Sequence, residues 1–481
     1  MHMSGAVRRI SQLVAGGLIA GLLVAGAGAA SQAAEPTGAP RASSPTRALN
    51  VLVLGDSYSA GNGATDDQGN EQYYGPADCY RSKVDWGEKY AAALRAAGQP
   101  VNLVNHACSG GVTADFTNPR VMDTSAPRTA ANPSGATTQS AADAALTAAD
   151  PCDTGQFPDE ESWTYASTVV TPLVITYTCT RTIRPQIDFI TPDTDLVLFT
   201  MGGNDIKFST IVTDCFILKN GASCKADIDA ATALLPTVRQ RLLGALAAMR
   251  AHGLRDDAKI VQLGYPLLQV DNDYRTPDGY QAGNAIRAFG LTGNAAIAAA
   301  VPEANAGHPG QVAFLGGVPE KFAGHEPDAS TPTGNPDRWI NQLDGTNSSF
   351  FYHPNRLGQT AYASLLAAQG TFGATPTGKK LEARLRVRLS RVGRTTPGRS
   401  TVRLRVKVRL NDEVSPRGKV VVRGLPGRHR LAVKKLRTSA DGRLRITVRL
   451  RTSQVKRLQV TYRDASAPAV TVTRRLRNGS R

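Results

Sequence analysis

The sequence predicts two units of different fold class, a three-layer α/β/α sandwich with a parallel sheet and, after it, an all-β sandwich. Over residues 49–372, short apolar runs alternate with helical patterns, as expected for the strands and crossover helices of a parallel sheet. From residue 381 the apolar period changes to two, which is typical of antiparallel strands with one buried face. The change of period therefore predicts a change of fold class.

The charge of the chain divides at the same place. The 481 residues carry a formal net charge of +17. Residues 376–481 hold 31 Lys and Arg against 5 Asp and Glu, a net charge of +26, so residues 1–375 carry −9. With 41% hydrophobic and 20% charged residues, the composition excludes a mostly disordered or fibrous chain. An acidic unit is followed by a strongly basic one.

The first residues have the pattern of an export signal. Arg8 and Arg9 precede an apolar run over 13–30, and small residues follow at Ser31 and Ala33. This predicts a signal peptide over 1–33 and a flexible lead-in over 34–48, which is rich in Ala, Pro, Ser and Thr. An uncleaved signal anchor is the alternative, because the run is long enough to span a bilayer. We expect a secreted monomer, extracellular or associated with the cell envelope.

Six cysteines fit an exported chain. All lie between residues 79 and 224, and an even number in an oxidising compartment indicates disulfides. Locality favours the pairs Cys79–Cys108, Cys152–Cys179 and Cys215–Cys224 over the other combinations that the sequence allows. A zinc cluster is the competing interpretation, but the sequence has no Cys-x-x-Cys and its seven histidines are scattered. We expect no metal.

The elements of the first unit follow in order. We expect strands at 49–54, 101–105, 195–200, 259–263 and 312–315, and helices at 86–97, 230–252, 279–301 and 358–369.

Two stretches break this alternation. Residues 112–180 are rich in Ala, Thr, Ser and Pro without a clean period, so we predict an insertion fastened by Cys152 and Cys179. Residues 316–349 are dense in Pro, Gly and Asp. Long ordered loops in α/β folds usually shape a site, so we expect both stretches to form walls of a substrate cleft.

Four polar segments are expected at one rim of the sheet. The first, Gly55-Asp56-Ser57-Tyr58-Ser59, directly follows the first strand, where a tight turn into a helix exposes a serine hydroxyl. The others are 105–110, Gly202-Gly203-Asn204-Asp205 and 353–358. Open α/β folds bind ligands at this rim. The alternatives are a turn glycine at Gly110 and an Asx-turn residue at Asn204, and His106 and His325 are interpreted as surface or structural histidines.

The four segments, in this order, resemble the four blocks of the SGNH (GDSL-type) hydrolases, and in particular secreted actinobacterial lipases and esterases. The resemblance covers residues 49–372 and implies an SGNH/flavodoxin-like fold. It assigns Ser57 as the nucleophile and His353 as the general base. The implied oxyanion-hole donors are the backbone N–H groups of Ser57 and Gly110 and the side-chain amide of Asn204. Such preorganised neutral donors stabilise the tetrahedral intermediate of acyl transfer.

One position departs from the family pattern. The acidic residue that commonly precedes the histidine by three positions is replaced by Phe350. Some secreted relatives orient the imidazole with a backbone carbonyl, so we predict that the Phe350 carbonyl accepts the His353 Nδ1–H. Asp344 is the alternative orienting group, which would complete a conventional triad.

These assignments predict a secreted serine carboxylic-ester hydrolase, an esterase or lipase with phospholipases included, that uses a Ser57–His353 dyad. No metal or organic cofactor is implied. Lipid esters lead among the substrates by resemblance. The alternatives are a polysaccharide O-deacetylase of the cell wall, and a cell-surface binding protein whose hydrolase domain is degenerate.

The basic tail predicts a second function. After a linker at 373–380, about seven short alternating segments indicate an immunoglobulin-like sandwich over 381–481, the type of repeat found in bacterial secreted proteins. Basic residues occupy the polar positions and so predict positive sheet faces. The expected partner is an anionic cell-wall polymer or an anionic lipid surface. Nucleic acid is not expected, because no aromatic stacking positions lie between the arginines. A merely solvated face is the alternative. The basic side chains in question are Arg384, Arg386, Arg388, Arg403, Arg405, Lys407, Arg409, Arg445 and Arg449.

Overall fold

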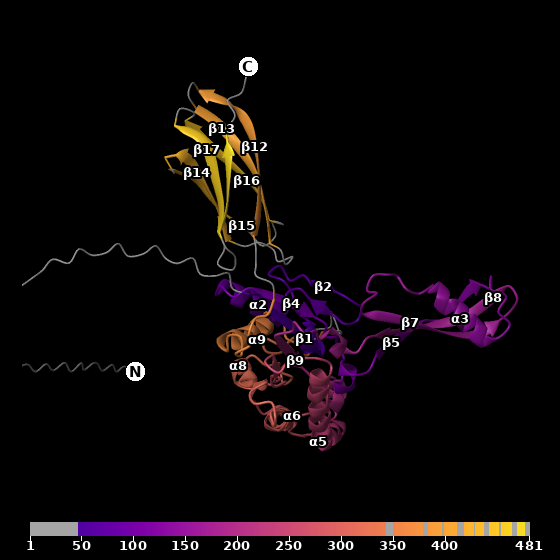
Figure 1. Ribbon diagram of the computed structural model, residues 1–481. Helices are drawn as coiled ribbons and strands as arrows, with labels where there is room; N and C mark the ends of the chain where they lie inside the picture. The colour runs from indigo at the N-terminus through magenta and orange to yellow at the C-terminus, as the bar shows by residue number, and fades with distance from the viewer. Residues whose placement is uncertain are drawn as a thin grey trace, which may run out of the picture. The chain divides into compact units, whose positions relative to one another are not determined.

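The computed structural model describes residues 47–342, 350–378, 383–396, 399–410, 418–427, 429–436, 442–451, 454–463 and 469–476 (Figure 1). The predicted signal peptide, most of the lead-in, part of the linker and Asp344 lie outside these residues. Within them, no helix combines the length and the apolar character that crossing a membrane requires.

A five-stranded parallel sheet forms the centre of the first unit, in the order β11-β10-β9-β1-β4. Counted from β4, the strands follow the chain as second, first, third, fourth and fifth, which is a doubly wound order. All of β9 is buried, as a strand flanked on both sides requires. The strands are β1 (Leu49–Gly55), β4 (Val101–Asn105), β9 (Leu196–Thr200), β10 (Lys259–Leu263) and β11 (Val312–Leu315).

Alternate residues of β1 build two different cores. Val51 and Val53 pack in one cluster with α2 (Trp86–Ala96) and α9 (Arg356–Ala368). Leu52 and Leu54 pack in the opposite cluster, with residues of α5 (Gly221–Ala251). Helices therefore cover both faces of the sheet, and the predicted α/β/α fold class is confirmed. The remaining helices of this unit are α1 (Ser57–Ala60), α4 (Phe208–Val212), α6 (Ala282–Ala298), α7 (Ala300–Ala304) and α8 (Val318–Phe322), with short 3-10 and π segments between them.

Helix α5 begins nine residues earlier than expected, at Gly221 instead of 230. The side chain of Asn220 caps it by accepting the N–H of Ser223 at 3.0 Å. The Cys215–Cys224 disulfide also fastens its first turn to the preceding segment. A cap and a disulfide thus extend the helix beyond its amphipathic part.

The insertion contains regular structure that the sequence analysis missed. It folds as an antiparallel sheet in which β8 (Val174–Ile183) pairs with β5 (Arg120–Thr124), β6 (Arg128–Ala131) and β7 (Glu161–Val170). Helix α3 (Gln139–Ala149) packs against it. The buried positions of β8 alternate as Ile175, Tyr177, Cys179, Arg181 and Ile183. A period of two was therefore present, hidden by threonines on the other face and by a buried arginine.

One ion pair of Arg181 ties the insertion to a neighbouring loop, and disulfides close the insertion and the loops beside it. Arg181 contacts Asp78, Asp123 and Glu161, at 2.7, 2.9 and 2.9 Å. Two short strands, β2 (Tyr73–Tyr74) and β3 (Arg81–Ser82), pair on either side of Cys79. The Cys79–Cys108 disulfide joins this hairpin to the loop after β4. The third disulfide, Cys152–Cys179, closes the insertion on itself. The structure thus contains the three expected cysteine pairs.

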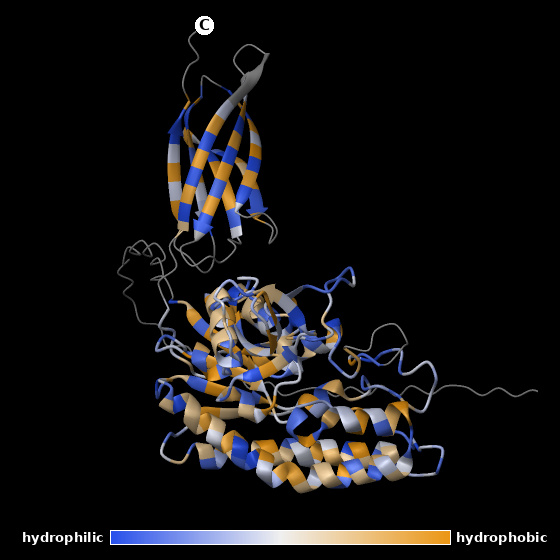
Figure 2. Cartoon of the chain, turned by 90° about the vertical axis from the view of Figure 1, so that its right-hand side faces the viewer, coloured by the Kyte–Doolittle hydropathy of each residue, from blue (hydrophilic) through white to orange (hydrophobic). Residues whose placement is uncertain are grey.

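The tail is all β, as predicted. Its strands form two antiparallel sheets, β12-β13-β16 and β15-β14-β17-β18, around one shared apolar core. Hydrophobic and hydrophilic residues alternate along the strands (Figure 2). The strands are β12 (Ala383–Thr396), β13 (Arg399–Leu410), β14 (Gly418–Pro426), β15 (His429–Leu436), β16 (Arg443–Arg451), β17 (Val455–Arg463) and β18 (Val470–Arg475).

Candidate active site

The site lies at the carboxyl ends of three neighbouring strands. Strand β1 has β4 on one side and β9 on the other, so the chain leaves the sheet in opposite directions around β1. This reversal opens a crevice in doubly wound folds. The segments that follow β1, β4 and β9 are the first three polar blocks of the sequence.

Ser57 occupies the first residue of α1 and is 7% exposed. The turn that places it needs Gly55, whose φ is +115° and whose Cβ, if present, would lie 2.2 Å from the Thr200 carbonyl. Asp56 then caps α1 by accepting the N–H of Tyr58. The local sequence therefore turns the chain sharply at the sheet edge and presents the Ser57 hydroxyl.

His353 lies beside this hydroxyl although 296 positions separate the two residues: Nε2 is 2.7 Å from Ser57 Oγ. The histidine loop is tied to α1 by the Tyr58 hydroxyl, which donates to the Tyr352 carbonyl at 2.7 Å. Asn341 donates its N–H to the His353 carbonyl at 2.8 Å. These bonds hold the base within hydrogen-bonding reach of the nucleophile.

The imidazole is oriented by a backbone carbonyl, but from a different residue than predicted. Nδ1 of His353 lies 3.1 Å from the carbonyl oxygen of Phe351. The Phe350 carbonyl, which we expected in this role, accepts the backbone N–H of His353 at 3.2 Å. Because the chain turns sharply here, the carbonyl of Phe351, the residue nearer in sequence, lies beside the His353 ring. Asp344, the alternative orienting group, lies outside the described residues.

Burial lowers the pKa of His353 to about 4, although the Phe351 and Phe350 carbonyls act in the opposite direction. A carbonyl carries no full charge, so it offsets the desolvation of the imidazolium less than a carboxylate would. The ring is consequently neutral at pH 7, and a neutral Nε2 can accept the Ser57 proton.

The predicted oxyanion donors come from three strand ends. Ser57 and Gly110 contribute backbone N–H groups, and neither group donates to another protein atom among the described residues. Gly110 has a φ of +77°. The Asn204 side chain donates one N–H to the Gly111 carbonyl at 2.8 Å, which places its amide beside the Gly110 loop. The second N–H of an amide remains available for an oxyanion.

Three residues that support these donors were not identified from the sequence. The Gln186 side chain forms two hydrogen bonds with Gly55: it accepts the N–H at 2.6 Å and donates to the carbonyl at 2.9 Å. Arg120 of β5 donates to the Ser109 carbonyl at 2.8 Å. Asp205 accepts the N–H and the hydroxyl of Thr113 at 2.9 and 2.5 Å. Of the three, Asp205 alone belongs to one of the four polar segments. Gln186 and Arg120 lie elsewhere in the sequence, and the fold brings them to the site.

Two buried carboxylates near the site have structural partners. Burial raises the pKa of Asp56 to about 6 and that of Asp85 to about 7. Asp56 accepts hydrogen bonds from Thr200 at 2.6 Å and from the Tyr265 hydroxyl. Asp85 caps α2 and accepts from Asn105 at 2.8 Å. The bonds of both carboxylates fix loops around Ser57.

His106 and His325 have structural surroundings, as expected, but they are stacked on aromatic rings. The His106 ring lies on Phe189 with centroids 3.6 Å apart, and its Nδ1 is 3.3 Å from Glu160. The His325 ring lies on Trp339 at 3.8 Å, with its Nδ1 2.8 Å from the Asp337 carbonyl.

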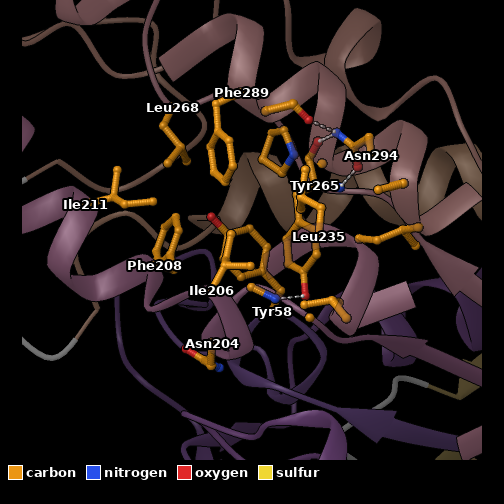
Figure 3. A pocket seen from close by; sticks show the side chains of 18 of the residues that line it. Tyr58, Asn204, Ile206, Phe208, Ile211, Leu235, Tyr265, Leu268, Phe289 and Asn294 are labelled. Carbon is orange, nitrogen blue, oxygen red and sulfur yellow. Dashed lines mark hydrogen bonds between the residues drawn. The ribbon is translucent and has the colours of Figure 1, made fainter. Parts of the chain in front are cut away.

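An apolar cavity opens beside Ser57 and Asn204 (Figure 3). Aliphatic and aromatic side chains from α4, α5 and α6 and from the segment after β10 point into it. They include Ile206, Phe208, Ile211, Leu235, Val238, Leu268, Ile286 and Phe289.

The prediction that residues 112–180 and 316–349 form the walls of the substrate cleft was wrong for this cavity. Neither the insertion nor the described part of 316–349 lines it. The lining helices bring together residues that are far apart in the sequence. The periodicity of each helix indicated an apolar face, but not that part of this face borders an open space.

Comparisons with known proteins find similar solved structures. No protein-family model matches the chain, and no curated protein matches it. The chain is similar to a phospholipase A1 from Streptomyces albidoflavus NA297, with 22% identity, a TM-score of 0.43, and 67% of this chain and 99% of that chain covered. It is also similar to an extracellular lipase from Streptomyces rimosus, with 22% identity and a TM-score of 0.41, and 67% of this chain and 99% of that chain are covered.

A putative GDSL-like lipase from Parabacteroides merdae ATCC 43184 is similar at 13% identity and a TM-score of 0.30, with 68% of this chain and 98% of that chain covered. The strand order, the polar segments at the rim and the Ser57–His353 contact all agree with the resemblance of the sequence to the SGNH (GDSL-type) hydrolases.

Proposed function

We propose that the protein is a secreted serine ester hydrolase that cleaves carboxylic esters of lipids, in the manner of a lipase or phospholipase. The observation that carries the proposal is the 2.7 Å contact between Ser57 Oγ and His353 Nε2 at the mouth of an apolar cavity. The three disulfides support the secreted location, because such bonds persist in oxidising compartments.

The geometry supports acyl transfer in two steps. Ser57 Oγ attacks the ester carbonyl carbon while its proton passes to His353 Nε2, and the resulting oxyanion faces the donors of Ser57, Gly110 and Asn204. His353 then protonates the departing alkoxide, and an acyl-enzyme remains on Ser57. Water attacks this ester with His353 again taking the proton, His353 returns that proton to Ser57 Oγ as the bond to the acyl carbon breaks, and the free acid leaves. The dyad is reset without any group beyond these side chains.

The cavity favours a lipid acyl chain over an acetyl group. Transfer of a hydrophobic chain from water into the cavity is favourable by about 0.8 kcal/mol per buried methylene group. An acetyl ester of a polysaccharide would use little of this space, and sugar hydroxyls would find few polar partners among the aliphatic and aromatic lining residues. The apolar lining therefore supports the lipid esters over the O-deacetylase alternative.

A chain-length series tests the activity and the substrate class together. Ser57→Ala should abolish hydrolysis of p-nitrophenyl esters from acetate to dodecanoate, with thermal unfolding unchanged. In the unsubstituted protein, kcat/KM should rise with chain length. Phe289→Ala, which removes part of the cavity wall, should lower kcat/KM for long esters about tenfold and leave acetate unaffected.

Leu291→Ala is the matched control, because Leu291 lies on the same helix and is 50% exposed. It should leave both ends of the series unchanged. Activity that survives Ser57→Ala would overturn the hydrolase assignment. Activity confined to acetyl esters, above all on an acetylated polysaccharide, would overturn the lipid assignment alone.

A further inference from the structure

The three-stranded sheet of the tail has an outward face made largely of arginine. Along β12, β13 and β16, buried aliphatic residues alternate with exposed positions. We call the exposed arginines of these strands the basic face, and Arg384, Arg386, Arg388, Arg405, Arg443 and Arg445 represent it. None of these six takes part in an ion pair with another described residue.

The strand register places these arginines directly opposite one another. Arg388 of β12 is paired with Arg405 of β13, and Arg405 is paired in turn with Arg445 of β16. Neighbouring strands are ~4.8 Å apart, and like charges directly opposite each other destabilise a sheet. The five acidic residues of 376–481 are not among the described residues, and every charged residue in the described strands of the tail is basic. The face therefore retains a repulsion that an alternating pattern of Lys and Glu would have removed.

The opposite sheet carries a less dense basic surface, in which outward residues such as Lys419, Arg457 and Arg463 are interspersed with uncharged ones. The outward positions of β17 and β18 include Gln459, Thr461, Thr471 and Thr473, which are uncharged. Solubility alone does not require the almost unbroken rows of arginine that the three-stranded sheet carries. The concentration indicates a binding surface for an anion larger than a single ion.

Arginine identifies the chemistry of that anion. Its planar guanidinium binds phosphate oxygens through two parallel hydrogen bonds and keeps its charge at all physiological pH values. Successive outward positions of one strand are ~6.6 Å apart, a spacing that successive phosphates of an extended polyol-phosphate chain can match. Rows of guanidinium groups therefore suit a polymer of phosphodiesters.

Two other polyanions fit the face less well. Surfaces that enter a membrane interface carry Trp, Phe or Leu beside the cations, and proteins that bind single-stranded nucleic acid stack bases on aromatic rings. The described outward positions of β12, β13 and β16 hold neither aromatic residues nor large aliphatic ones. We propose that the basic face binds an anionic polyol-phosphate polymer of the cell envelope. This proposal is independent of the ester hydrolysis proposed above.

The test measures binding of the full-length mature protein to a fluorescent synthetic poly(glycerol phosphate) over a range of salt concentrations. The test variant is R386Q/R388Q/R405Q/R445Q. The matched control is K419Q/R423Q/R457Q/R463Q, which removes the same charge from outward positions of the other sheet. Gln keeps most of the aliphatic stem, and circular dichroism with thermal unfolding of each variant reports that its tail is folded.

Loss of the four contacts should reduce the slope of log K against log salt by about 0.7 for each, close to 3 in all. Affinity at 0.1 M salt should fall at least about tenfold in the test variant and less than about threefold in the control. Equal losses in the two variants would overturn the proposal, because the net charge alone would then explain binding. Absence of binding by the unsubstituted protein at low salt would also overturn it.

Two further probes identify the source of the phosphates. Vesicles with 30% anionic phospholipid and single-stranded DNA of matched charge should bind more weakly than the polymer. Tighter binding to vesicles that is lost in the test variant would replace the polymer with a membrane surface. Equal binding to DNA would show a generic polyanion surface and so overturn the assignment to a polyol phosphate.

Discussion

The rim of the parallel sheet and the basic face of the tail use polar residues in opposite ways. At the rim each functional group is single and held by specific bonds, as Tyr58, Asn341 and Phe351 hold the histidine loop around His353. On the basic face many equivalent arginines stand in rows, and the six that represent it form no ion pair with another described residue. The rim depends on the position of individual atoms, whereas the face depends on a sum of weak contacts. A single substitution at the rim should therefore reduce activity by orders of magnitude more than a single substitution on the basic face reduces binding.

After the loss of Ser57 itself, the largest effect is expected for the side-chain donor of the oxyanion hole. Asn204→Ala should lower kcat about 10²- to 10³-fold, because removing one preorganised donor from a tetrahedral intermediate has that effect. KM for a short ester should change little, since the donor acts mainly in the transition state. Steady-state kinetics on p-nitrophenyl butyrate would measure both. A fall in kcat of less than about threefold would show that Asn204 holds only the Gly111 loop.

The pH profile tests how the base is oriented. His353 must be neutral to accept the Ser57 proton, and burial places its pKa at about 4. The value of kcat/KM should therefore stay level as pH falls from 8 to about 5, and then drop about tenfold per pH unit below about 4. If a carboxylate paired with the ring, it would stabilise the imidazolium and move this acid limb toward 6.5 or above.

Asp344→Asn sharpens the same question. With the Phe351 carbonyl as acceptor, this substitution should change kcat by less than about threefold and leave the acid limb in place. A loss of several thousandfold with an intact fold would establish a conventional triad, because a wrong imidazole tautomer has an effect of that order.

A smaller effect is expected where the insertion supports the rim. Arg120→Gln removes the bond to the Ser109 carbonyl and should lower kcat about tenfold by loosening the Gly110 donor. Since Arg120 acts through the loop, KM for a short ester should be unaffected. Arg128→Gln on neighbouring β6, an exposed position, is the control and should have no effect. A matching loss in both variants would indicate damage to the insertion as a whole.

The smallest effect is expected for one arginine of the basic face. Arg405→Gln should reduce the salt slope of poly(glycerol phosphate) binding by about 0.7 and weaken affinity only about two- to threefold at 0.1 M salt. Hydrolysis of a soluble ester should be unchanged. A loss of a hundredfold from this single change would make the face a site with one dominant contact, and the face would then no longer differ from the rim in this respect.

Local patterns in the sequence determined most of the architecture. The apolar runs within β1 and β9 have few alternatives, because a strand buried on both faces needs nearly uninterrupted hydrophobic residues. The shorter runs of β4, β10 and β11 were predicted from their alternation with helices. The change to a period of two predicted the all-β tail for a similar reason. The four motifs predicted Ser57, Gly110, Asn204 and His353 by resemblance. In each case the signal lay within a few consecutive residues, where the sequence can be interpreted without knowing the packing.

Contacts between distant residues were decided only by the tertiary structure. The turn around Tyr352 determines that Phe351 and not Phe350 meets the His353 ring, a difference that no spacing rule contains. Gln186 and Arg120 reach the site from segments whose sequences have no motif. The apolar cavity exists because α5 and α6 leave a space beside Ser57 that their side chains do not fill. Such features depend on how whole elements pack, and the free energy of packing is shared among residues that are remote in the chain.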